Sequence, residues 1–247
     1  MLEVRNLKKS FGALCVTNDV SLSVAAGERR VILGPNGAGK TTLFNLLVGE
    51  LTPTAGTVLL GGEDVTRLNV AQRARRGLSR SYQKNTLFDG LTVRQNLGLA
   101  ASVALGRAGL FPADSLADRA VAETVAEVAA QVGLTPLLDA PIDAVSYGAR
   151  RQLEVGVALA TRPRVLLMDE PTSGVGPEMI GQLYRLLKDL PRELAVVIIE
   201  HDMDLAFDVA DSVTVLNYGQ VVFDGEPEAA RRSALLKDIY LGSWEDA

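Results

Sequence analysis

One glycine-rich stretch constrains this chain more than any other feature. Residues 34–41 read Gly-Pro-Asn-Gly-Ala-Gly-Lys-Thr and fit the phosphate-binding pattern G-x-x-x-x-G-K-[ST] at every specified position. The apolar run 30–33 predicts a short buried strand before this loop, and the run 42–48 predicts an apolar-faced helix after it. Because such a loop needs a strand before it and a helix after it, a glycine-rich turn that matches by chance is the less favoured alternative.

The residue types of this loop, called the P-loop below, predict phosphate binding. Glycines let the backbone curl so that its N–H groups point inward, and the N-terminus of the following helix attracts anions. We expect Lys40 to reach the β- and γ-phosphates and the Thr41 hydroxyl to bind Mg²⁺. The predicted nucleotide-binding residues of the loop are Asn36, Gly37, Ala38, Gly39, Lys40, Thr41 and Thr42.

A second apolar run ends in two adjacent acids. Residues 165–168 predict a buried strand that leads into Asp169 and Glu170. We expect Asp169 to hold Mg²⁺ opposite Thr41, and Glu170 to polarise an attacking water as a general base. Two merely exposed acids at a strand end are the less favoured alternative, because the apolar residues bury the strand and so position its carboxyl end.

The only histidine follows a third apolar run. His201 comes shortly after residues 196–199, which predict another buried strand. A lone histidine is usually a packed core residue. Here it falls at the carboxyl edge of the predicted sheet, where α/β folds bind ligands, so we favour a contact to the γ-phosphate.

The segment before the P-loop has a different pattern. Short β-type runs at residues 2–4, 13–16 and 20–24 are separated by predicted turns, which indicates a mainly antiparallel N-terminal sheet. Phe11 lies in one of these turns. Its ring could stack on a purine base or plug the space between two sheets, and the sequence leaves both readings open.

The middle of the chain is helical in character. From about residue 92 to residue 160 the composition shifts to alanine, leucine and valine at helical spacing. A helix is predicted over 115–132, and one of its faces carries Leu116, Val121, Val125, Val128 and Val132. We interpret this segment as a helical subdomain inserted into an α/β core, and its apolar face as core packing.

Composition and charge disfavour several functions. The chain has 247 residues and a formal net charge of −5, which gives no general affinity for nucleic acid. A basic patch is therefore interpreted as a solvated helix face; its members are Arg73, Arg75, Arg76 and Arg80. Apolar runs such as 195–199 are far shorter than the roughly 20 residues of a spanning helix.

The N-terminus and the single cysteine allow two further expectations. No charged-then-apolar leader opens the sequence, so we expect a cytoplasmic location. Cys15 is the only cysteine, which excludes an internal disulfide, and we expect it to be a small buried side chain.

Taken in order, the motifs resemble those of the ATP-binding cassette (ABC) ATPases over residues 2–242. The resemblance is carried by Phe11, the P-loop, Gln83, the stretch Val145-Ser146-Tyr147-Gly148, Asp169-Glu170 and His201. It implies one ATPase domain over residues 1–247: an α/β P-loop NTPase core with an N-terminal antiparallel β-subdomain and an α-helical subdomain inserted at about 92–160.

The same resemblance implies partners and further site residues. Ser146 and Gly148 would belong to a signature loop that binds the γ-phosphate of ATP held by a second ATPase subunit, identical or different. Gln83 would sense the γ-phosphate, join the Mg²⁺ site and touch transmembrane permease subunits, while Phe11 would contact the nucleotide. ATP and Mg²⁺ are the implied cofactors, nucleic acid is not an implied partner, and the chain would lie peripherally on the inner face of the plasma membrane.

A finer resemblance points to the ATPases of branched-chain amino-acid importers. It is carried by Phe11-Gly12, residues 86–88 and 91–93, Ser146-Tyr147-Gly148, residues 200–203, residues 240–242, and the long insert between Asn96 and Val121. ATPases of urea or short-amide importers, lipopolysaccharide exporters and soluble non-transport ABC ATPases remain alternatives. The insert favours the amino-acid importers.

Two positions depart from the family pattern. Ala149 stands where the signature usually has glutamine, and we expect the site to survive because Ser146 and Gly148 supply the phosphate contacts. Gly176 stands where the family usually has Asp or Asn, a side chain that helps the two subunits communicate. We expect Gly176 to affect the hydrolysis rate or the coupling between sites, and ATP binding to be retained.

Overall fold

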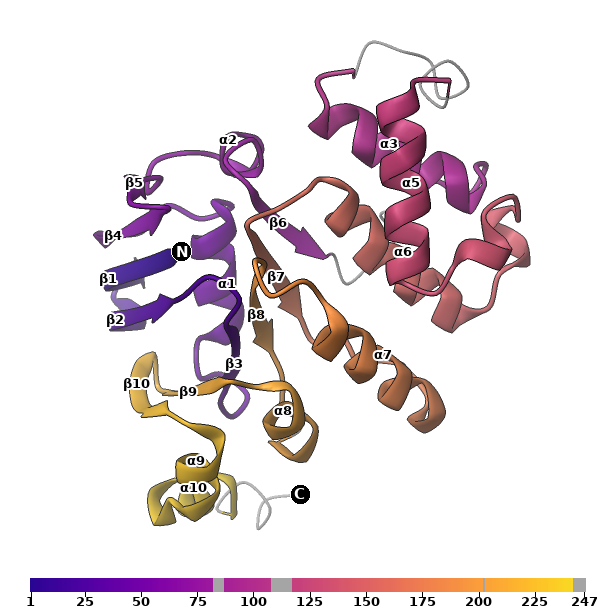
Figure 1. Cartoon of the computed structure of the whole chain (residues 1–247). Coiled ribbons are helices and arrows are strands. Elements are labelled where there is room, and N and C mark those ends of the chain that lie inside the picture. Colours follow the sequence, from indigo (N-terminus) through magenta and orange to yellow (C-terminus); the bar gives the residue numbers. More distant parts are fainter. Residues whose placement is uncertain (82–86, 108–116, 202, 242–247) are drawn as a thin grey trace.

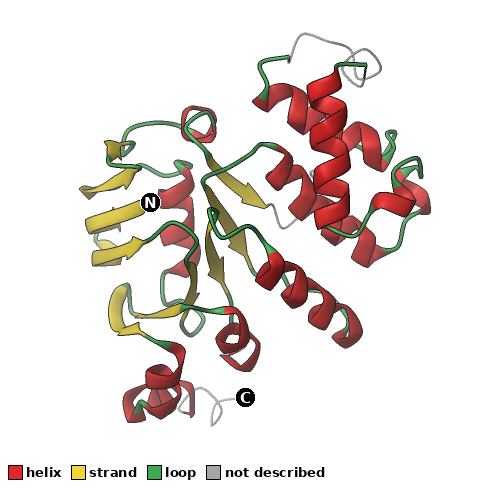
Figure 2. Ribbon diagram, viewed as in Figure 1, coloured by secondary structure: helices red, strands yellow, loops and turns green. Residues whose placement is uncertain are grey.

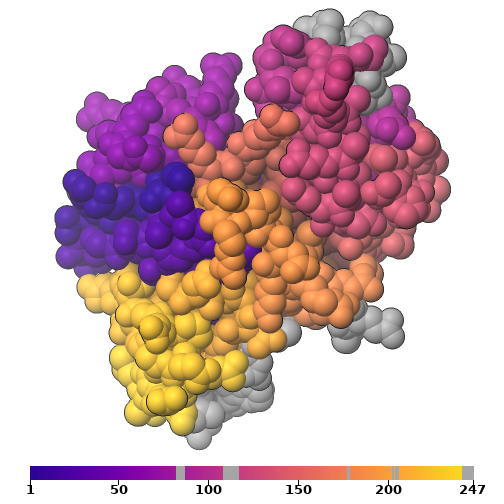
Figure 3. Space-filling view, viewed as in Figure 1, coloured from indigo at the N-terminus to yellow at the C-terminus, as the bar shows by residue number. Residues whose placement is uncertain are grey.

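Two sheets and a group of helices make up the molecule in the computed structural model (Figures 1 and 2). The structure describes residues 1–81, 87–107, 117–201 and 203–241. The space-filling view shows the N-terminal, helical and C-terminal segments occupying separate parts of the visible face (Figure 3).

The N-terminal sheet is antiparallel, which confirms the prediction. Its order is β2-β1-β4-β5, with bounds Leu2–Phe11 (β1), Leu14–Val24 (β2), Ala55–Leu60 (β4) and Glu63–Asp64 (β5). Leu2 on β1 pairs with Val24 on one side and with Leu60 on the other. Alternating residues of β1 and β2 are buried, as expected for a sheet with one face on the core.

The second sheet is mainly parallel and holds the predicted site. Its order is β10-β9-β3-β8-β7-β6, with bounds Arg29–Leu33 (β3), Leu78–Ser81 (β6), Val165–Asp169 (β7), Ala195–Ile199 (β8), Ser212–Asn217 (β9) and Gln220–Gly225 (β10). β8 lies between β3 and β7 and is parallel to both. The carboxyl ends of these three strands therefore meet at one edge of the sheet.

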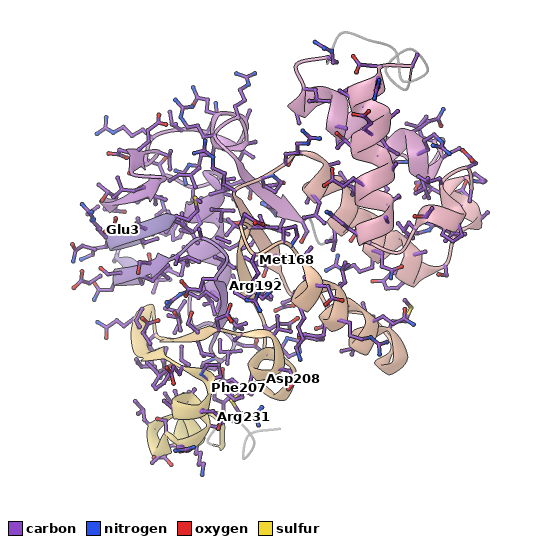
Figure 4. All side chains as sticks on the ribbon, in the orientation of Figure 1. Glu3, Met168, Arg192, Phe207, Asp208 and Arg231 are labelled. Carbon is purple, nitrogen blue, oxygen red and sulfur yellow. The ribbon has the colours of Figure 1, made fainter. Side chains whose placement is uncertain are left out.

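Both faces of this sheet are covered. Helix α1 (Lys40–Val48) lies between the two sheets and packs on Leu167, whereas Leu166 and Met168 pack with α7 (Pro177–Asp189). Figure 4 labels Met168 on β7, between strands β8 and β6. Strands buried on both faces explain the unbroken apolar runs in the sequence.

The helical segment lies between β6 and β7 along the chain. Its helices are α3 (Val93–Ala104), α5 (Arg119–Gln131) and α6 (Tyr147–Ala160), with short 3-10 turns at Thr135–Leu137 and Ile142–Ala144. Val121, Val125, Val128 and Val132 are buried together, as predicted, whereas Leu116 lies outside the described residues. The described residues include no helix that is long and apolar enough to cross a bilayer.

The remaining helices are short. They are α2 (Val70–Ala74), α8 (Met203–Val209), α9 (Pro227–Arg232) and α10 (Ala234–Leu241). α8 follows β8, and α9 and α10 follow β10 at the C-terminal end of the chain (Figure 1).

Three side chains depart from the sequence-based expectations. The prediction that the basic patch is a solvated helix face is wrong for two of its members. Arg73 is fully buried, and Arg80 lies on strand β6 and pairs with Glu50 at 2.5 Å. Cys15 is exposed rather than buried, because it lies near the hairpin end of β2, where both Leu14 and Cys15 face solvent.

Candidate functional site

The P-loop joins β3 to α1 and curls around the amine of Lys40. Lys40 is only 8% exposed, and its Nζ donates hydrogen bonds to the carbonyl oxygens of Gly34 (2.6 Å) and Pro35 (3.1 Å). Gly39, the N-cap of α1, has φ 99°, and a Cβ there would lie 2.7 Å from the Val16 carbonyl oxygen. Only glycine fits this turn, which holds Lys40 at the mouth of the loop.

The other predicted P-loop residues surround this lysine. Asn36, Gly37 and Thr41 are exposed, Ala38 is buried, and Gly39 and Thr42 are half-buried. The Thr41 hydroxyl is thus accessible at the N-terminus of α1, where the helix dipole favours an anion.

Charges of opposite sign face one another at the carboxyl edge of the sheet. Burial lowers the pKa of Lys40, and the nearby carboxylates of Glu170 and Asp169 oppose that effect. Burial, and next the charge of Glu170, raise the pKa of Asp169, while Arg80 and Lys40 oppose the rise. The structure therefore brings Lys40, Asp169 and Glu170 together as the sequence predicted, and adds Arg80, which the sequence analysis had assigned to a solvated surface.

Glu170 lies in an uncommon backbone conformation. Its φ is 43°, in the left-handed region that costs a residue with a side chain about 1–3 kcal/mol. Its N–H donates to the Ile199 carbonyl oxygen (2.9 Å), and its own carbonyl oxygen accepts from the N–H of Ser173 (3.0 Å) and from the Nη2 of Arg151 (3.2 Å). These contacts hold the sharp turn that follows β7.

Glu200 and His201 directly follow β8 at the same edge of the sheet. His201 is not a packed core residue, because its side chain is 60% exposed. Its backbone N–H donates to the Glu200 carboxylate (3.3 Å), and its Nδ1 lies 3.8 Å from the same oxygen. The imidazole therefore faces solvent beside the turn that carries Glu170, where a substrate phosphate could reach it.

Glu200 is a residue that the sequence analysis missed. It is fully buried, and its carboxylate accepts hydrogen bonds from the Thr172 hydroxyl (2.7 Å) and the Thr172 N–H (3.3 Å). Burial raises the pKa of Glu200, and these hydrogen bonds oppose the rise. An acid directly after an apolar strand was the available signal. Glu200 ties the end of β8 to the turn after β7.

The signature loop lies apart from the P-loop within this chain. The Ser146 hydroxyl caps α6 by accepting from the Ala149 N–H (3.2 Å), so the helix begins at Tyr147. Gly148 packs against Met179 of α7: a Cβ at residue 148 would lie 1.6 Å from the Met179 Cε. The helical segment thus carries Ser146 and Gly148, while α1 lies between the two sheets (Figure 1).

Two further predicted residues have different outcomes. Phe11 ends β1 and is 48% exposed, with the Lys9 amine 5.1 Å from the ring centroid, so its ring does not plug the space between the sheets. Gln83 lies outside the described residues. Its proposed contacts stay predictions.

The donor set suits a Mg²⁺ ion that arrives with a nucleotide. Among the described residues, no group of three or more His, Cys, Asp or Glu side chains could hold a metal ion by itself. Mg²⁺ usually takes one or two carboxylates together with substrate phosphate oxygens and water. Asp169 and the exposed Thr41 match this partial set.

One C-terminal helix, α10, contacts the start of the P-loop, while α9 packs on α8. Burial raises the pKa of Tyr240 on α10 to about 12, and a hydrogen bond with the Gly34 backbone opposes the rise. On α9, Arg231 lies over the Phe207 ring of α8 at 4.9 Å (Figure 4). A cavity of about 370 Å³ runs along the outer side of the P-loop and is lined by Pro35, Asn36, Gly37, Ala38, Asn217, Tyr218 and Ile239.

Gly176 leaves the first turn of α7 without a side-chain cap. It has φ −69° and ψ 156°, its carbonyl oxygen accepts from Met179 N–H (2.9 Å), and nothing lies within 4 Å of a Cβ placed there. Any residue therefore fits this backbone.

We expect Gly176→Asn to raise the free energy of unfolding by about 0.5–1 kcal/mol, because its side chain can accept from the first free N–H groups. Urea denaturation measures the change. Gly176→Ala, which adds a Cβ but no acceptor, is the control; an equal gain in that variant would show that capping is not the cause.

Comparison with known proteins connects this geometry to one family. Residues 17–173 match the family model described as ABC transporter. The chain is 37% identical over 249 residues to the high-affinity branched-chain amino acid transport ATP-binding protein BraF of Pseudomonas aeruginosa, with 98% of each chain covered. It is 33% identical to the lipopolysaccharide export system ATP-binding protein LptB of Haemophilus influenzae, covering 98% of this chain and 97% of the other. A solved ATP-binding cassette of an ABC transporter in its ADP conformation superposes with a TM-score of 0.84 at 29% identity, with 98% of each chain covered.

Proposed function

The chain belongs to the ABC transporter family, and we propose that it drives import of branched-chain or related amino acids. The family confirms the predicted fold class and the predicted enzyme, an ATPase. The solute, the residue roles, the subunit partners and the location belong to the proposal, as does a single domain over residues 1–247 with a helical subdomain at about 92–160.

One observation carries the assignment of the catalytic site. The amine of Lys40, at the start of α1, and the carboxylates of Asp169 and Glu170, at the end of β7, come from segments far apart in the sequence, yet they lie close enough at one sheet edge to influence one another's charge. Phosphoryl transfer needs this combination of a cation for the phosphates, a carboxylate for the metal and a base for the nucleophile.

The proposal gives each predicted site residue a role. Lys40 and the N–H groups of residues 36–42 bind the β- and γ-phosphates, and Thr41 and Asp169 hold Mg²⁺, with Gln83 completing that site. The bound Mg²⁺ supplies positive charge that offsets the developing negative charge of the transferred phosphoryl group. Glu170 takes the proton of the attacking water, and His201 orients the γ-phosphate. Phe11 stacks on the base.

The separation of the signature loop from the P-loop supports a dimer. Ser146 and Gly148 lie at the N-terminus of α6, which favours an anion, but they belong to another part of the chain. We infer that they contact the γ-phosphate bound by a second ATPase subunit, identical or different. Binding of ATP then closes the dimer and hydrolysis releases it, and permease subunits at the inner face of the plasma membrane follow this motion.

The solute is assigned from the relatives. The BraF relative is more similar to this chain than the LptB relative, at 37% against 33% identity. The long insert between Asn96 and Val121, which the sequence analysis took as typical of the amino-acid importers, favours the same assignment. Urea or short-amide import, lipopolysaccharide export and a soluble function remain the competing assignments.

An uptake experiment in the host cell separates these assignments. We expect deletion of the gene to abolish most uptake of labelled leucine at micromolar concentration, and a plasmid copy of the gene to restore it. A plasmid that encodes Glu170→Gln is the matched control and should not restore uptake. Normal leucine uptake in the deletion strain, with loss of urea uptake or of surface lipopolysaccharide, would contradict the proposed solute class.

A further inference from the structure

The start of the signature helix is attached to the turn that carries Glu170. Arg151, in the second turn of α6, donates from Nε to the Pro171 carbonyl oxygen (2.8 Å) and from Nη2 to the Glu170 carbonyl oxygen (3.2 Å). One guanidinium thus binds two consecutive carbonyls, a geometry that its planar fork favours.

The position of Arg151 is itself fixed. Its side chain is 7% exposed, and its Nη1 lies 2.5 Å from the Glu154 carboxylate, which is one turn further along α6 and 12% exposed. A buried, charge-assisted pair restricts the guanidinium to one orientation. The contact between Arg151 and the turn after β7 therefore has a fixed geometry.

The turn needs such a contact. With φ 43°, Glu170 occupies a conformation that persists only where its surroundings determine it. The N–H of the residue is held by Ile199 of β8, and its carbonyl oxygen is held by the Ser173 N–H and by Arg151 of α6. Loss of the Arg151 contact leaves that carbonyl held only by Ser173, a residue of the same turn.

Other contacts join the same two segments. Gly148 packs directly on Met179, and the Tyr147 hydroxyl lies 3.5 Å from the Ser173 carbonyl oxygen. The first two turns of α6 therefore contact the segment after β7 at several points, and among these contacts it is Arg151 that reaches the backbone of Glu170.

We propose that Arg151 is a positioning residue through which the signature helix sets the backbone of the general base. The inference rests on the proposed function, in which Glu170 acts on ATP in this chain's P-loop while Ser146 and Gly148 contact ATP on the second subunit. Arg151 then couples the two ATP sites: a shift of α6 when its loop meets one ATP displaces the base that serves the other.

The test is ATP hydrolysis by purified Arg151→Lys. Lysine keeps the charge but cannot bind both carbonyls, so kcat should fall about 10- to 100-fold while the KM for ATP stays within about twofold. Arg119→Lys is the matched control, because Arg119 pairs with Glu123 on α5 in an exposed i,i+4 ion pair (2.7 Å) and touches no site residue. That variant should hydrolyse ATP like the unaltered chain.

A double substitution separates positioning from a general structural role. If Arg151 acts through Glu170, Arg151→Lys should change the residual turnover of Glu170→Gln by less than twofold, because the base is already absent. If Arg151→Lys lowers turnover by the same factor in the unaltered chain and in Glu170→Gln, the inference is overturned. Equal turnover of Arg151→Lys and Arg119→Lys would also overturn it.

If Arg151→Lys does not fold, Glu154→Gln replaces it in the test. A lower kcat at unchanged KM supports the inference, and an unchanged kcat contradicts it. Absence of turnover in the unaltered chain would instead contradict the proposed function.

Discussion

Replacing Glu170 by Gln is expected to lower ATP turnover by about 10²- to 10⁴-fold, the usual contribution of a positioned general base. The amide has the shape of the carboxylate but cannot take a proton from water. The backbone contacts of residue 170 involve its N–H and carbonyl oxygen, so the substitution leaves the turn intact. ATP affinity, which depends on the P-loop, should change little.

Three measurements check this prediction: steady-state phosphate release, titration with a fluorescent ATP analogue, and size-exclusion chromatography in Mg-ATP. The variant should bind the nucleotide and accumulate as a dimer, since hydrolysis no longer releases the closed state. Glu193→Gln is the control, because Glu193 is exposed before β8 and lies outside the site. Turnover of the Glu170 variant equal to that of this control would exclude Glu170 as the base.

The sequence predicted the catalytic edge because its signals are local. The strand–loop–helix pattern around Lys40, and apolar strands ending at Asp169 and near His201, can each be read within about ten residues. In a parallel sheet the carboxyl ends share one edge, so placement of these strands also placed the side chains. The mainly antiparallel N-terminal sheet was predicted in the same way, from short β-type runs separated by turns.

The missed residues depend on contacts that no local pattern encodes. Arg151 has the same sequence context as Arg150, yet Arg151 is buried against the turn after β7 and Arg150 is half-buried beside Asp143. The buried Glu200 matters because Thr172, 28 residues earlier, lies beside it. The burial of these side chains is decided by tertiary packing, so charge and periodicity alone could not identify them.

The basic patch shows again that a local sequence pattern does not determine which charged side chains are buried. Arg73 and Arg75 are two residues apart, but Arg73 is fully buried and Arg75 is exposed. Arg73 is buried because it lies against the end of α1. Its guanidinium donates to four carbonyl oxygens: those of Leu46 (2.6 Å), Leu47 (2.6 Å), Leu68 (3.0 Å) and Thr66 (2.9 Å). Two of these are in the last turn of α1, where the helix dipole favours a cation.

Arg73→Ala is therefore expected to lower the free energy of unfolding by at least about 3 kcal/mol, because buried carbonyls lose a charged donor and a cavity forms. Burial lowers the pKa of Arg73 to about 10, so the guanidinium is charged at neutral pH. Arg73→Lys should recover only part of the loss, since one ammonium cannot reach all four carbonyls. Urea denaturation should show a lower midpoint with an unchanged slope.

The exposed Arg75→Ala is the control for Arg73→Ala and should stay within about 0.5 kcal/mol of the unaltered chain. Equal midpoints for the two variants would show that the carbonyl contacts of Arg73 do not stabilise the fold. The P-loop lies at the other end of α1, so its phosphate site depends on how well this helix is anchored. Excess Mg-ATP, which binds only the folded chain, should then raise the midpoint of Arg73→Ala by mass action. No such rise would mean that loosening the end of α1 also disrupts the P-loop.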